Sequence, residues 1–347
     1  MTFRGDFMKT KQIVFTEIGK AELLDAVCAE PASNEVRVKM AYTAISCGTE
    51  RANLMGDVNV DASCPPESNI PQFPRYLGYS GSGVVDAVGE SVKDLKAGDR
   101  VVVTGSYHKG YCNVNEKSAF KIESEKVSLD QAAFSYIAAF SLAAVRKTRL
   151  EIGESMIVMG LGILGIFAVH FSKAAGAYPV IAVDPEPARR EFALKMGADF
   201  ALDPFDPDFQ KTVKKITGKG AKCAIEVSGK GTALNQVLEV MDRFGRVALL
   251  GCTRDSDFSV DFYRKVHYPG VTLIGAHTGA RPGTSAPGGW NLKDDIRAML
   301  GLLEGGRIDF ENMICQVRKP EEAAEVYADL MHRKDFPIGT LFDWEGV

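Results

Sequence analysis

The amino-acid sequence predicts an α/β protein of two domains, an antiparallel, barrel-like β domain followed by a doubly wound parallel sheet. Short β segments separated by glycine-rich turns fill about the first 125 residues. From about residue 130 strands alternate with helices, which is typical of a parallel sheet covered on both faces. A chain of 347 residues, 46% of them hydrophobic, is long enough to bury two ordinary cores.

Each element is predicted from its hydrophobic period and the turns that bound it. The β domain has expected strands at residues 11–17, 35–45, 78–89, 98–105 and 113–122. Helical periodicity begins at residues 130–150. In the second domain the expected strands are 154–160, 178–184, 200–204, 223–229 and 246–251, and the expected helices are 163–176, 187–197, 209–218 and 233–245.

Composition excludes several kinds of partner. The net charge is -4, and Lys and Arg are scattered, so neither nucleic acid nor a membrane surface is expected as a partner. The longest apolar run, residues 156–169, contains three glycines and is shorter than the roughly 20 residues of a membrane-spanning helix, so it is predicted to be core. The N-terminus lacks a secretory pattern, and seven scattered cysteines without C-x-x-C suit a reducing cytoplasm.

A glycine motif opens the second domain. Gly160, Gly162 and Gly165 form G-x-G-x-x-G directly after an expected strand and at the start of an expected helix. The first glycine permits a tight turn, the second lets the backbone approach a pyrophosphate, and the third lets the helix lie close to the strand. The helix start, at Ile163 and Leu164, offers N–H groups to phosphates. The motif predicts a Rossmann dinucleotide site; the alternative is a glycine-rich turn that binds no nucleotide.

Asp184 indicates which dinucleotide is preferred. It ends the next expected strand, 19 residues beyond Gly165, close to the spacing of about 20 for an acid that binds the adenosine ribose hydroxyls. A carboxylate there repels a 2′-phosphate, so NAD is predicted over NADP. Arg189 and Arg190 follow closely and keep NADP open as an alternative.

Two more strand ends extend the predicted cofactor site. Residues 227–229 and 249–253 end successive parallel strands, where ligands of open α/β sheets collect. We expect this part of the chain to line the nicotinamide half of the cofactor through Ser228, Gly251, Cys252, Ala276 and His277.

The chain as a whole resembles the medium-chain dehydrogenase/reductase family, the relatives of zinc-type alcohol dehydrogenases. The resemblance rests, in order, on "AISCGTERANLMG", "LGYSGSGVVDAVGESVKDLKAGDRVVV", "GLGILG", "FGRVALLG" and "GLLEGGRIDFENMI" followed by "EEAAEVYADLM". It implies a GroES-like catalytic domain of residues 1–137 and 277–347, a Rossmann domain of residues 138–276, and a substrate bound in the cleft between them. The pattern is similar to a branch with bacteriochlorophyllide dehydrogenase relatives and threonine or sorbitol dehydrogenase-like proteins.

The resemblance does not extend to the residues that bind the catalytic metal in zinc members of the family. Zinc members of the family bind the catalytic ion with a Cys, a His in a G-H-E segment and a third Cys or carboxylate. Cys47 matches the first ligand, but the G-H-E segment reads Gly78-Tyr79-Ser80, and the third position falls at or next to Tyr136. Catalytic zinc normally has three protein ligands, so no metal is predicted. The alternative is a zinc site built from Cys47, Glu50 and a partner such as His108 or His277.

Without an ion, side chains must handle the substrate proton. Tyr79 can donate a hydrogen bond to a substrate oxygen and pass a proton if a neighbouring cation lowers its pKa; the alternative is a tyrosine that fills vacated volume. By resemblance, Thr49 is the proton-relay hydroxyl and Glu50 the carboxylate that orients the missing histidine. Glu50 is then free to act as a base or to bind a substrate hydroxyl, unless it forms a structural ion pair with Arg51 or another base.

The segment at residues 279–291, rich in Gly, Pro, Ser and Thr, predicts a functional loop or lid. In the family this crossing lies beside the nicotinamide and in the subunit interface, which implies a homodimer or homotetramer. His277, just before it, is a second acid/base candidate or a structural histidine. Trp290 either covers a sugar-like substrate or packs.

These observations predict an NAD(H)-dependent oxidoreductase without catalytic zinc that interconverts an alcohol with a ketone or aldehyde. Four polar candidates, Thr49, Glu50, Tyr79 and His277, favour a small-molecule substrate of the polyol or sugar type, because buried donors and acceptors reject ligands that leave them unpaired. Two alternatives stay open. One is a zinc-free quinone or enone reductase that uses NADPH, which Asp184 disfavours, and the other is a non-catalytic nucleotide-binding sensor or scaffold.

Overall fold

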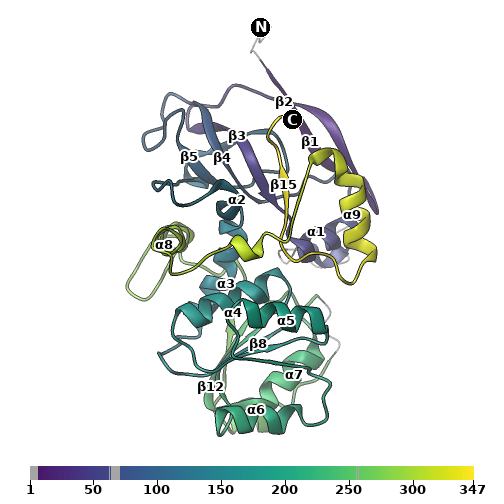
Figure 1. Ribbon diagram of the computed structural model, residues 1–347, viewed down its shortest axis with the longest axis vertical. Helices are drawn as coiled ribbons and strands as arrows, with labels where there is room; N and C mark the ends of the chain where they lie inside the picture. The colour runs from purple at the N-terminus through teal and green to yellow at the C-terminus, as the bar shows by residue number, and fades with distance from the viewer. Residues whose placement is uncertain (1–6, 62, 64–70, 255, 257) are drawn as a thin grey trace. The chain divides into compact units, whose positions relative to one another are not determined.

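The computed structural model describes all of the chain except residues 1–6, 62, 64–70, 255 and 257 (Figure 1). The chain divides into two compact units, Met1–Ile137 with Ile296–Val347, and Ala138–Asp295. Helices α3 (Ser135–Lys147) and α8 (Leu292–Glu304) run across the two boundaries. The predicted α/β fold class is confirmed: one unit is a GroES-like, mainly antiparallel β domain and the other has a parallel sheet.

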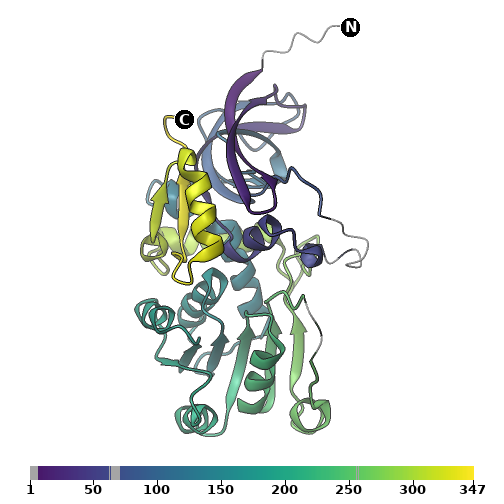
Figure 2. The same ribbon diagram turned by 90° about the vertical axis from the view of Figure 1, so that its right-hand side faces the viewer.

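The first unit contains a seven-stranded sheet and a separate hairpin of β1 and β2 (Figure 2). The sheet has the order β14-β15-β3-β4-β5-β7, and β6 pairs with β3. Strands β14 and β15 pair in parallel, whereas the other pairs are antiparallel. The bounds are β1 Met8–Glu17, β2 Lys20–Cys28, β3 Glu35–Ala44, β4 Ser80–Val88, β5 Arg100–Thr104, β6 Tyr111–Asn115, β7 Ala119–Lys121, β14 Gln316–Arg318 and β15 Thr340–Asp343.

Helices close the first unit around one hydrophobic core. They are α1 (Cys47–Leu54), α2 (Leu129–Ala132) and α9 (Ala323–His332), with parts of α3 and α8. Helix α9 lies against β2 and places Tyr327 edge-on to Phe15, with ring centroids 4.8 Å apart. The aliphatic side chains of β3 and β5 complete this core. The N- and C-terminal parts of the chain therefore share one core.

The second unit is a six-stranded parallel sheet in the order β10-β9-β8-β11-β12-β13. Helices α4 and α5 cover one face, and α6 and α7 cover the other (Figure 1). The strands are β8 Met156–Met159, β9 Val180–Val183, β10 Phe200–Leu202, β11 Ala221–Glu226, β12 Met241–Leu249 and β13 Thr272–Gly275. The helices are α4 Ile163–Ala174, α5 Pro187–Lys195, α6 Phe209–Thr217 and α7 Gly231–Val240.

Strands buried on both faces explain the apolar runs in the sequence. All four residues of β8 and of β9 are buried, as expected of parallel strands between two helical layers. The run at residues 156–169 is divided between β8 and α4, so it is core, as predicted. Within the described part of the chain no helix has the length and hydropathy needed to cross a membrane.

Three details differ from the sequence expectations. The helix expected at residues 233–245 ends at Val240, because Met241 already begins β12. The strand expected at residues 113–122 is two strands, separated by a turn that the Asn115 side chain caps by accepting from the Lys117 backbone N–H. The hairpin strand β2 has no counterpart among the expected strands.

The segment after β13 lies in the second unit, whereas the sequence boundaries assigned residues 277–295 to the first domain. Lys147 Nζ donates to the carbonyl oxygens of Gly275 and Ala280, at 2.8 and 2.6 Å. Arg281 Nη2 donates to the Ala139 carbonyl at 2.5 Å. These bonds anchor the segment to the part of α3 that belongs to the second unit.

The cysteines include no disulfide among the described residues, and six of the seven are free thiols. Cys64 lies outside the described residues. The cytoplasmic location inferred from cysteine usage stays a prediction.

The close packing of α4 on β8 yields a first prediction. A Cβ at position 165 would lie 1.9 Å from the Gly160 carbonyl oxygen, a backbone atom that cannot move aside. We expect Gly165→Ala to lower the free energy of unfolding by about 3 kcal/mol in urea titrations, because the helix must shift away from the strand. Gly301→Ala in α8, where a Cβ meets no atom within 4 Å, is the control, expected to be neutral or stabilising by roughly 0.5–1 kcal/mol. Equal stability of the two variants would contradict the close approach.

Candidate active site

The glycine motif has the geometry that a pyrophosphate requires. Gly160 follows β8 with φ +96°, in the left-handed region, and turns the chain towards α4. Gly162 precedes the helix in extended conformation, and a Cβ there would meet nothing within 4 Å, so the backbone is open to a ligand. Gly165 lies against the Gly160 carbonyl. The three glycines thus hold the three positions that their spacing predicts. Ile163 is buried, and Leu164 accepts a hydrogen bond from the Ser141 hydroxyl at its carbonyl oxygen.

Asp184 follows β9 and is held by two backbone donors. Its Oδ2 accepts from the Leu161 N–H at 2.8 Å, and its Oδ1 accepts from the Glu186 N–H at 2.9 Å. The residue is only 4% exposed, and Arg189 Nη1 lies 3.8 Å from Oδ2. Each carboxylate oxygen has lone pairs for further donors, so the group can accept from ribose hydroxyls. Arg190 donates to the carbonyl oxygens of Asp184 and Pro185.

The ends of β11 and β12 pack backbone to backbone beside the glycine turn. A Cβ at Gly251 would lie 2.4 Å from the Gly229 N atom, and one at Gly160 would lie 3.1 Å from the Ser228 N atom. Ser228 and Cys252 are exposed at this edge of the sheet. The structure therefore brings together the sequence-predicted residues of three strand ends.

Glu226 orders the turn after β11, and sequence reasoning missed it. Its carboxylate accepts from the backbone N–H groups of Ser228 and Gly229 and from the Ser228 hydroxyl. Burial raises the pKa of Glu226, and these hydrogen bonds act against that rise. An acidic residue at the end of an apolar strand is the sequence signal that would have found it.

The predicted residues after β13 have different environments. Ala276 is buried, and His277 is exposed, with Nδ1 accepting from the Gly279 N–H at 3.1 Å. Trp290 stacks on Arg146, whose guanidinium carbon lies 3.5 Å from the ring centroid. The packing alternative for Trp290 thus has a partner in the structure. The acid/base role of His277 stays a prediction.

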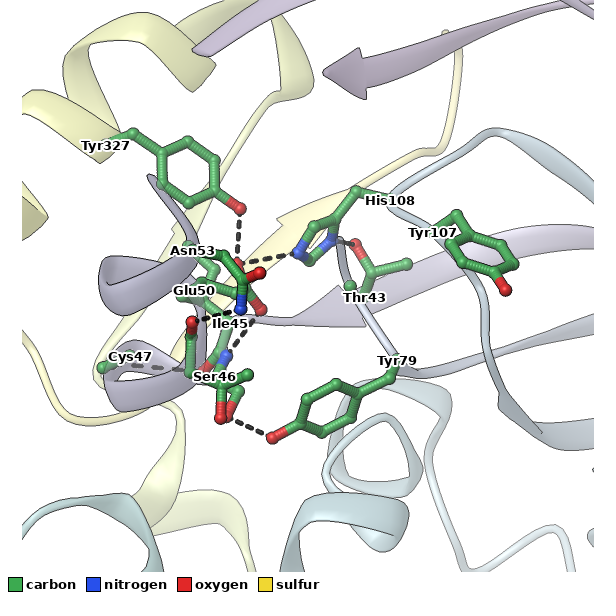
Figure 3. A network of polar contacts seen from close by, with 12 residues as sticks. Thr43, Ile45, Ser46, Cys47, Glu50, Asn53, Tyr79, Tyr107, His108 and Tyr327 are labelled. Carbon is green, nitrogen blue, oxygen red and sulfur yellow. Dashed lines mark hydrogen bonds and ion pairs between the residues drawn. The ribbon is translucent and has the colours of Figure 1, made fainter. Parts of the chain in front are cut away.

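In the first unit the start of α1 has an unusual cap. Ser46 occupies the N-cap position, yet its hydroxyl makes no capping bond to the helix. Instead, Glu50 Oε1 accepts from the Ser46 backbone N–H at 2.8 Å, and the Ser46 hydroxyl hydrogen-bonds the Tyr79 phenol (Figure 3). A residue type that usually caps a helix is here bonded to a candidate catalytic side chain.

Glu50 is fully buried, at 0% exposure, and accepts from three groups. Besides the Ser46 N–H, its Oε2 accepts from the Tyr327 hydroxyl at 2.6 Å and lies 3.2 Å from His108 Nε2. Figure 3 shows both rings pointing at the carboxylate. The alternative of a structural pairing is therefore realised with His108, whereas Arg51 donates to the Met331 carbonyl.

The hydrogen bonds at Nδ1, on the other side of the His108 ring, indicate which tautomer is present. Trp344 Nε1 can only donate, and it donates to Thr43 Oγ1 at 2.9 Å. Thr43 Oγ1 also lies 2.7 Å from His108 Nδ1. All groups are satisfied when Thr43 donates to Nδ1 and the Nε2–H donates to Glu50. The network is buried and joins α1, β3, α9 and the segment after β15.

His108 is held in a strained backbone conformation. Its φ is +41°, and that of Tyr107 is +56°, both unusual for side chains with a Cβ. Such residues cost of the order of 1–3 kcal/mol each and persist where the surroundings fix them. Gly78, at φ +90°, makes room, because a Cβ there would lie 2.4 Å from the His108 ring. The glycine before Tyr79 is thus required by the histidine.

The positions that the family resemblance aligns with zinc ligands are Cys47, Tyr79 and a third at or next to Tyr136. The rings of Tyr79 and Tyr136 meet edge to face, with centroids 5.6 Å apart. Burial raises the pKa of Tyr79 well above its usual value, while hydrogen bonds from Ser46 and Thr49 act in the opposite direction. Cys47 Sγ lies 3.8 Å from the Ile338 carbonyl oxygen. Within the described ranges, no three His, Cys, Asp or Glu side chains are grouped so that they could hold a metal ion.

Comparison with known proteins defines the class. Residues 32–147 match the alcohol dehydrogenase GroES-like domain, and residues 164–292 match the zinc-binding dehydrogenase family. The chain belongs to the zinc-type medium-chain dehydrogenase/reductase family, and it is an alcohol or polyol dehydrogenase-like enzyme.

Individual relatives have low sequence identity to this chain, but the similarity covers most of its length. The L-threonine 3-dehydrogenase of Pyrococcus furiosus is 28% identical, over 93% of this chain and 94% of its own. The D-guloside 3-dehydrogenase of Escherichia coli K12 is 26% identical, over 96% and 100%. Among solved structures, the 2R,3R-butanediol dehydrogenase of Bacillus subtilis shares the fold with a TM-score of 0.80 at 22% identity, over 96% and 99%.

The buried network yields a second prediction. Tyr327→Phe removes one donor from the Glu50 carboxylate without changing the shape of the core. We expect the free energy of unfolding to fall by about 1–3 kcal/mol, because a buried charged acceptor loses a hydrogen bond. Tyr107→Phe is the matched control, since that ring is half exposed and points away from the network (Figure 3). Denaturant titration measures both, and a Tyr327→Phe variant as stable as the control would argue against the bond.

Proposed function

We propose that this protein is an NAD(H)-dependent dehydrogenase that interconverts a polyol or sugar-like alcohol with a ketone or aldehyde, without catalytic zinc. The observation that carries the proposal is the phenol of Tyr79, bonded to two hydroxyl groups at the position of a family metal ligand. The substrate class is supported by relatives named for threonine, guloside, butanediol and sorbitol, all of which bear hydroxyl groups.

The donor set does not fit a catalytic zinc ion. Zinc in proteins is bound by thiolate, imidazole and carboxylate groups, three of them from protein at a catalytic site. The corresponding positions here provide one thiol, Cys47, and two phenols, of which Tyr79 is kept protonated by its raised pKa. His108 and Glu50, the alternative partners, are bonded to each other inside the buried network. No step of the reaction is therefore assigned to a metal.

A dinucleotide fits the residues of the second unit. When bound, NAD accepts or returns the hydride. Gly162 offers open backbone to the pyrophosphate, and Asp184 accepts from the adenosine ribose hydroxyls. A solved relative from Escherichia coli was crystallised with NADH and another, from Sinorhizobium meliloti, with NADP. The choice of NAD for this chain rests on Asp184.

The first unit supplies groups for the proton. During oxidation the alcohol loses a hydride from carbon to NAD and a proton from oxygen to a base; reduction reverses both transfers. In the reduction direction Tyr79, which its raised pKa keeps protonated, gives this proton to the substrate oxygen; in oxidation the phenolate takes it back. Hydrogen bonds to the phenol oxygen from the hydroxyl groups of Ser46 and Thr49 stabilise the phenolate. His277 stays a candidate for a second proton-transfer group. Burial of Glu50 within three hydrogen bonds favours a supporting part for it over direct contact with substrate.

Two other functions remain testable alternatives. A quinone or enone reductase that uses NADPH would need a ribose site that accepts a 2′-phosphate, and Arg189 and Arg190 beside Asp184 are the observations in its favour. A nucleotide-binding sensor or scaffold would bind NAD without hydride transfer. A homodimer or homotetramer and a cytoplasmic location stay predictions of the sequence.

The decisive experiment combines metal removal with turnover. We expect protein dialysed against a strong chelator to contain no stoichiometric zinc and to reduce NAD with one or more members of a panel of polyols and sugars at an unchanged rate. A zinc-dependent alcohol dehydrogenase treated in parallel should lose its activity. Zinc retained at one ion per chain, or activity that returns only with zinc, would refute the metal-free site; NAD binding without any turnover would favour the sensor.

Cofactor choice gives a further prediction. Asp184→Asn removes the charge that repels a 2′-phosphate, so we expect the ratio of NAD to NADP affinity, measured by calorimetry, to fall about tenfold or more. Asp206→Asn is the matched control, because Asp206 is exposed and also caps a turn, accepting from the Asp208 N–H at 2.8 Å. Tighter binding of NADP than NAD by the unmodified protein would contradict the assignment and favour the enone reductase.

A further inference from the structure

Tyr79 has a partner that the family resemblance does not provide. The resemblance assigns a relay hydroxyl to Thr49, but the Tyr79 phenol also hydrogen-bonds the hydroxyl of Ser46, the residue before Cys47. Ser46 is 5% exposed, so water does not compete freely for this bond. Two hydroxyl groups thus approach one phenol oxygen from the start of the same helix.

The backbone of Ser46 is held so that its hydroxyl can make this contact. It stands at the N-cap of α1 with φ −91° and ψ 82°, and its side chain makes no bond to the helix. Instead of the Ser46 side chain accepting from a backbone N–H of the helix, the Glu50 side chain accepts from the backbone N–H of Ser46. The Ser46 hydroxyl is thereby available to the phenol, while its backbone is fixed by a charge-assisted bond.

The support extends to His108 and Tyr327. Glu50 can hold Ser46 only if its own position is fixed, and Oε2 is fixed by the Tyr327 hydroxyl and His108 Nε2. A continuous chain of contacts therefore leads from His108 through Glu50 and Ser46 to the oxygen of Tyr79 (Figure 3). His108, Glu50 and Ser46 are buried, whereas Tyr79 is half-buried.

We propose that Ser46 is a positioning residue for Tyr79, held by Glu50 and His108, and that it orients the phenol and donates to the phenolate formed during proton transfer. The inference rests on the proposed dehydrogenase function and deepens it. As the substrate gives its hydroxyl proton to Tyr79, or receives one from it, Ser46 keeps its own proton and changes only the direction of its hydrogen bond. No bond to Ser46 is formed or broken apart from hydrogen bonds.

A double-mutant cycle tests the inference. Ser46→Ala should lower kcat about 10- to 100-fold with NAD affinity unchanged, because a hydrogen bond to a developing charge is lost. In a Tyr79→Phe background, itself slower than the unmodified enzyme, the same change should have little further effect. Ser46→Thr, which restores a hydroxyl, should recover activity. Equal losses in both backgrounds would show a general structural effect and overturn the proposal.

Two controls separate this outcome from misfolding and from an incorrect function. Ser172→Ala removes another fully buried hydroxyl, one without a hydrogen-bond partner among the described residues, and should leave kcat and stability unchanged. In protein labelled with carbon-13 at the tyrosine ring, the resonance of the Tyr79 hydroxyl-bearing carbon, assigned with Tyr79→Phe, should shift in Ser46→Ala. That shift needs no turnover, so an unmoved resonance refutes the contact, whereas a moved resonance in a protein without dehydrogenase activity refutes only the proposed function.

Discussion

The buried carboxylate of Glu50 joins three distant parts of the first unit. A carboxylate removed from water costs several kcal/mol unless donors surround it, and Glu50 has three. These donors come from the start of α1, from the strained turn at His108 and from α9 near the C-terminus. Because all three must be in place together, the carboxylate fixes the geometry of the candidate site at the same time as it joins distant parts of the chain.

The second unit is organised by backbone geometry instead of by buried charge. Its ligand-facing edge consists of glycines at strand ends, where the absence of a Cβ lets one turn lie against the next. Asp184 and Glu226 contribute charge there, but each acts by accepting backbone N–H groups of its own turn. In the proposed reaction, the close packing of glycine turns thus makes room for the dinucleotide, and a hydrogen-bonded phenol handles the proton.

This difference explains what the sequence could predict. Dinucleotide motifs are local, so the spacing of Gly160, Gly165 and Asp184 was enough to predict a cofactor site, and hydrophobic periodicity located most of the parallel sheet. The network around Glu50 is non-local: Tyr327 lies 277 positions away and His108 lies 58 away. The neighbouring Arg51 was an equally reasonable partner in sequence terms. The contacts that hold the segment after β13 are non-local in the same way, since the bonds of Lys147 to that segment span more than 120 positions.

The contact between the Tyr79 and Tyr136 rings has a consequence for substitutions at either position. Each aromatic ring is one wall of the space that the other fills, so replacing either by a smaller ligating side chain leaves an unfilled volume beside the survivor. A substitution at one of these positions therefore changes the surroundings of the other, so the energetic effects of changing the two tyrosines are expected to be non-additive.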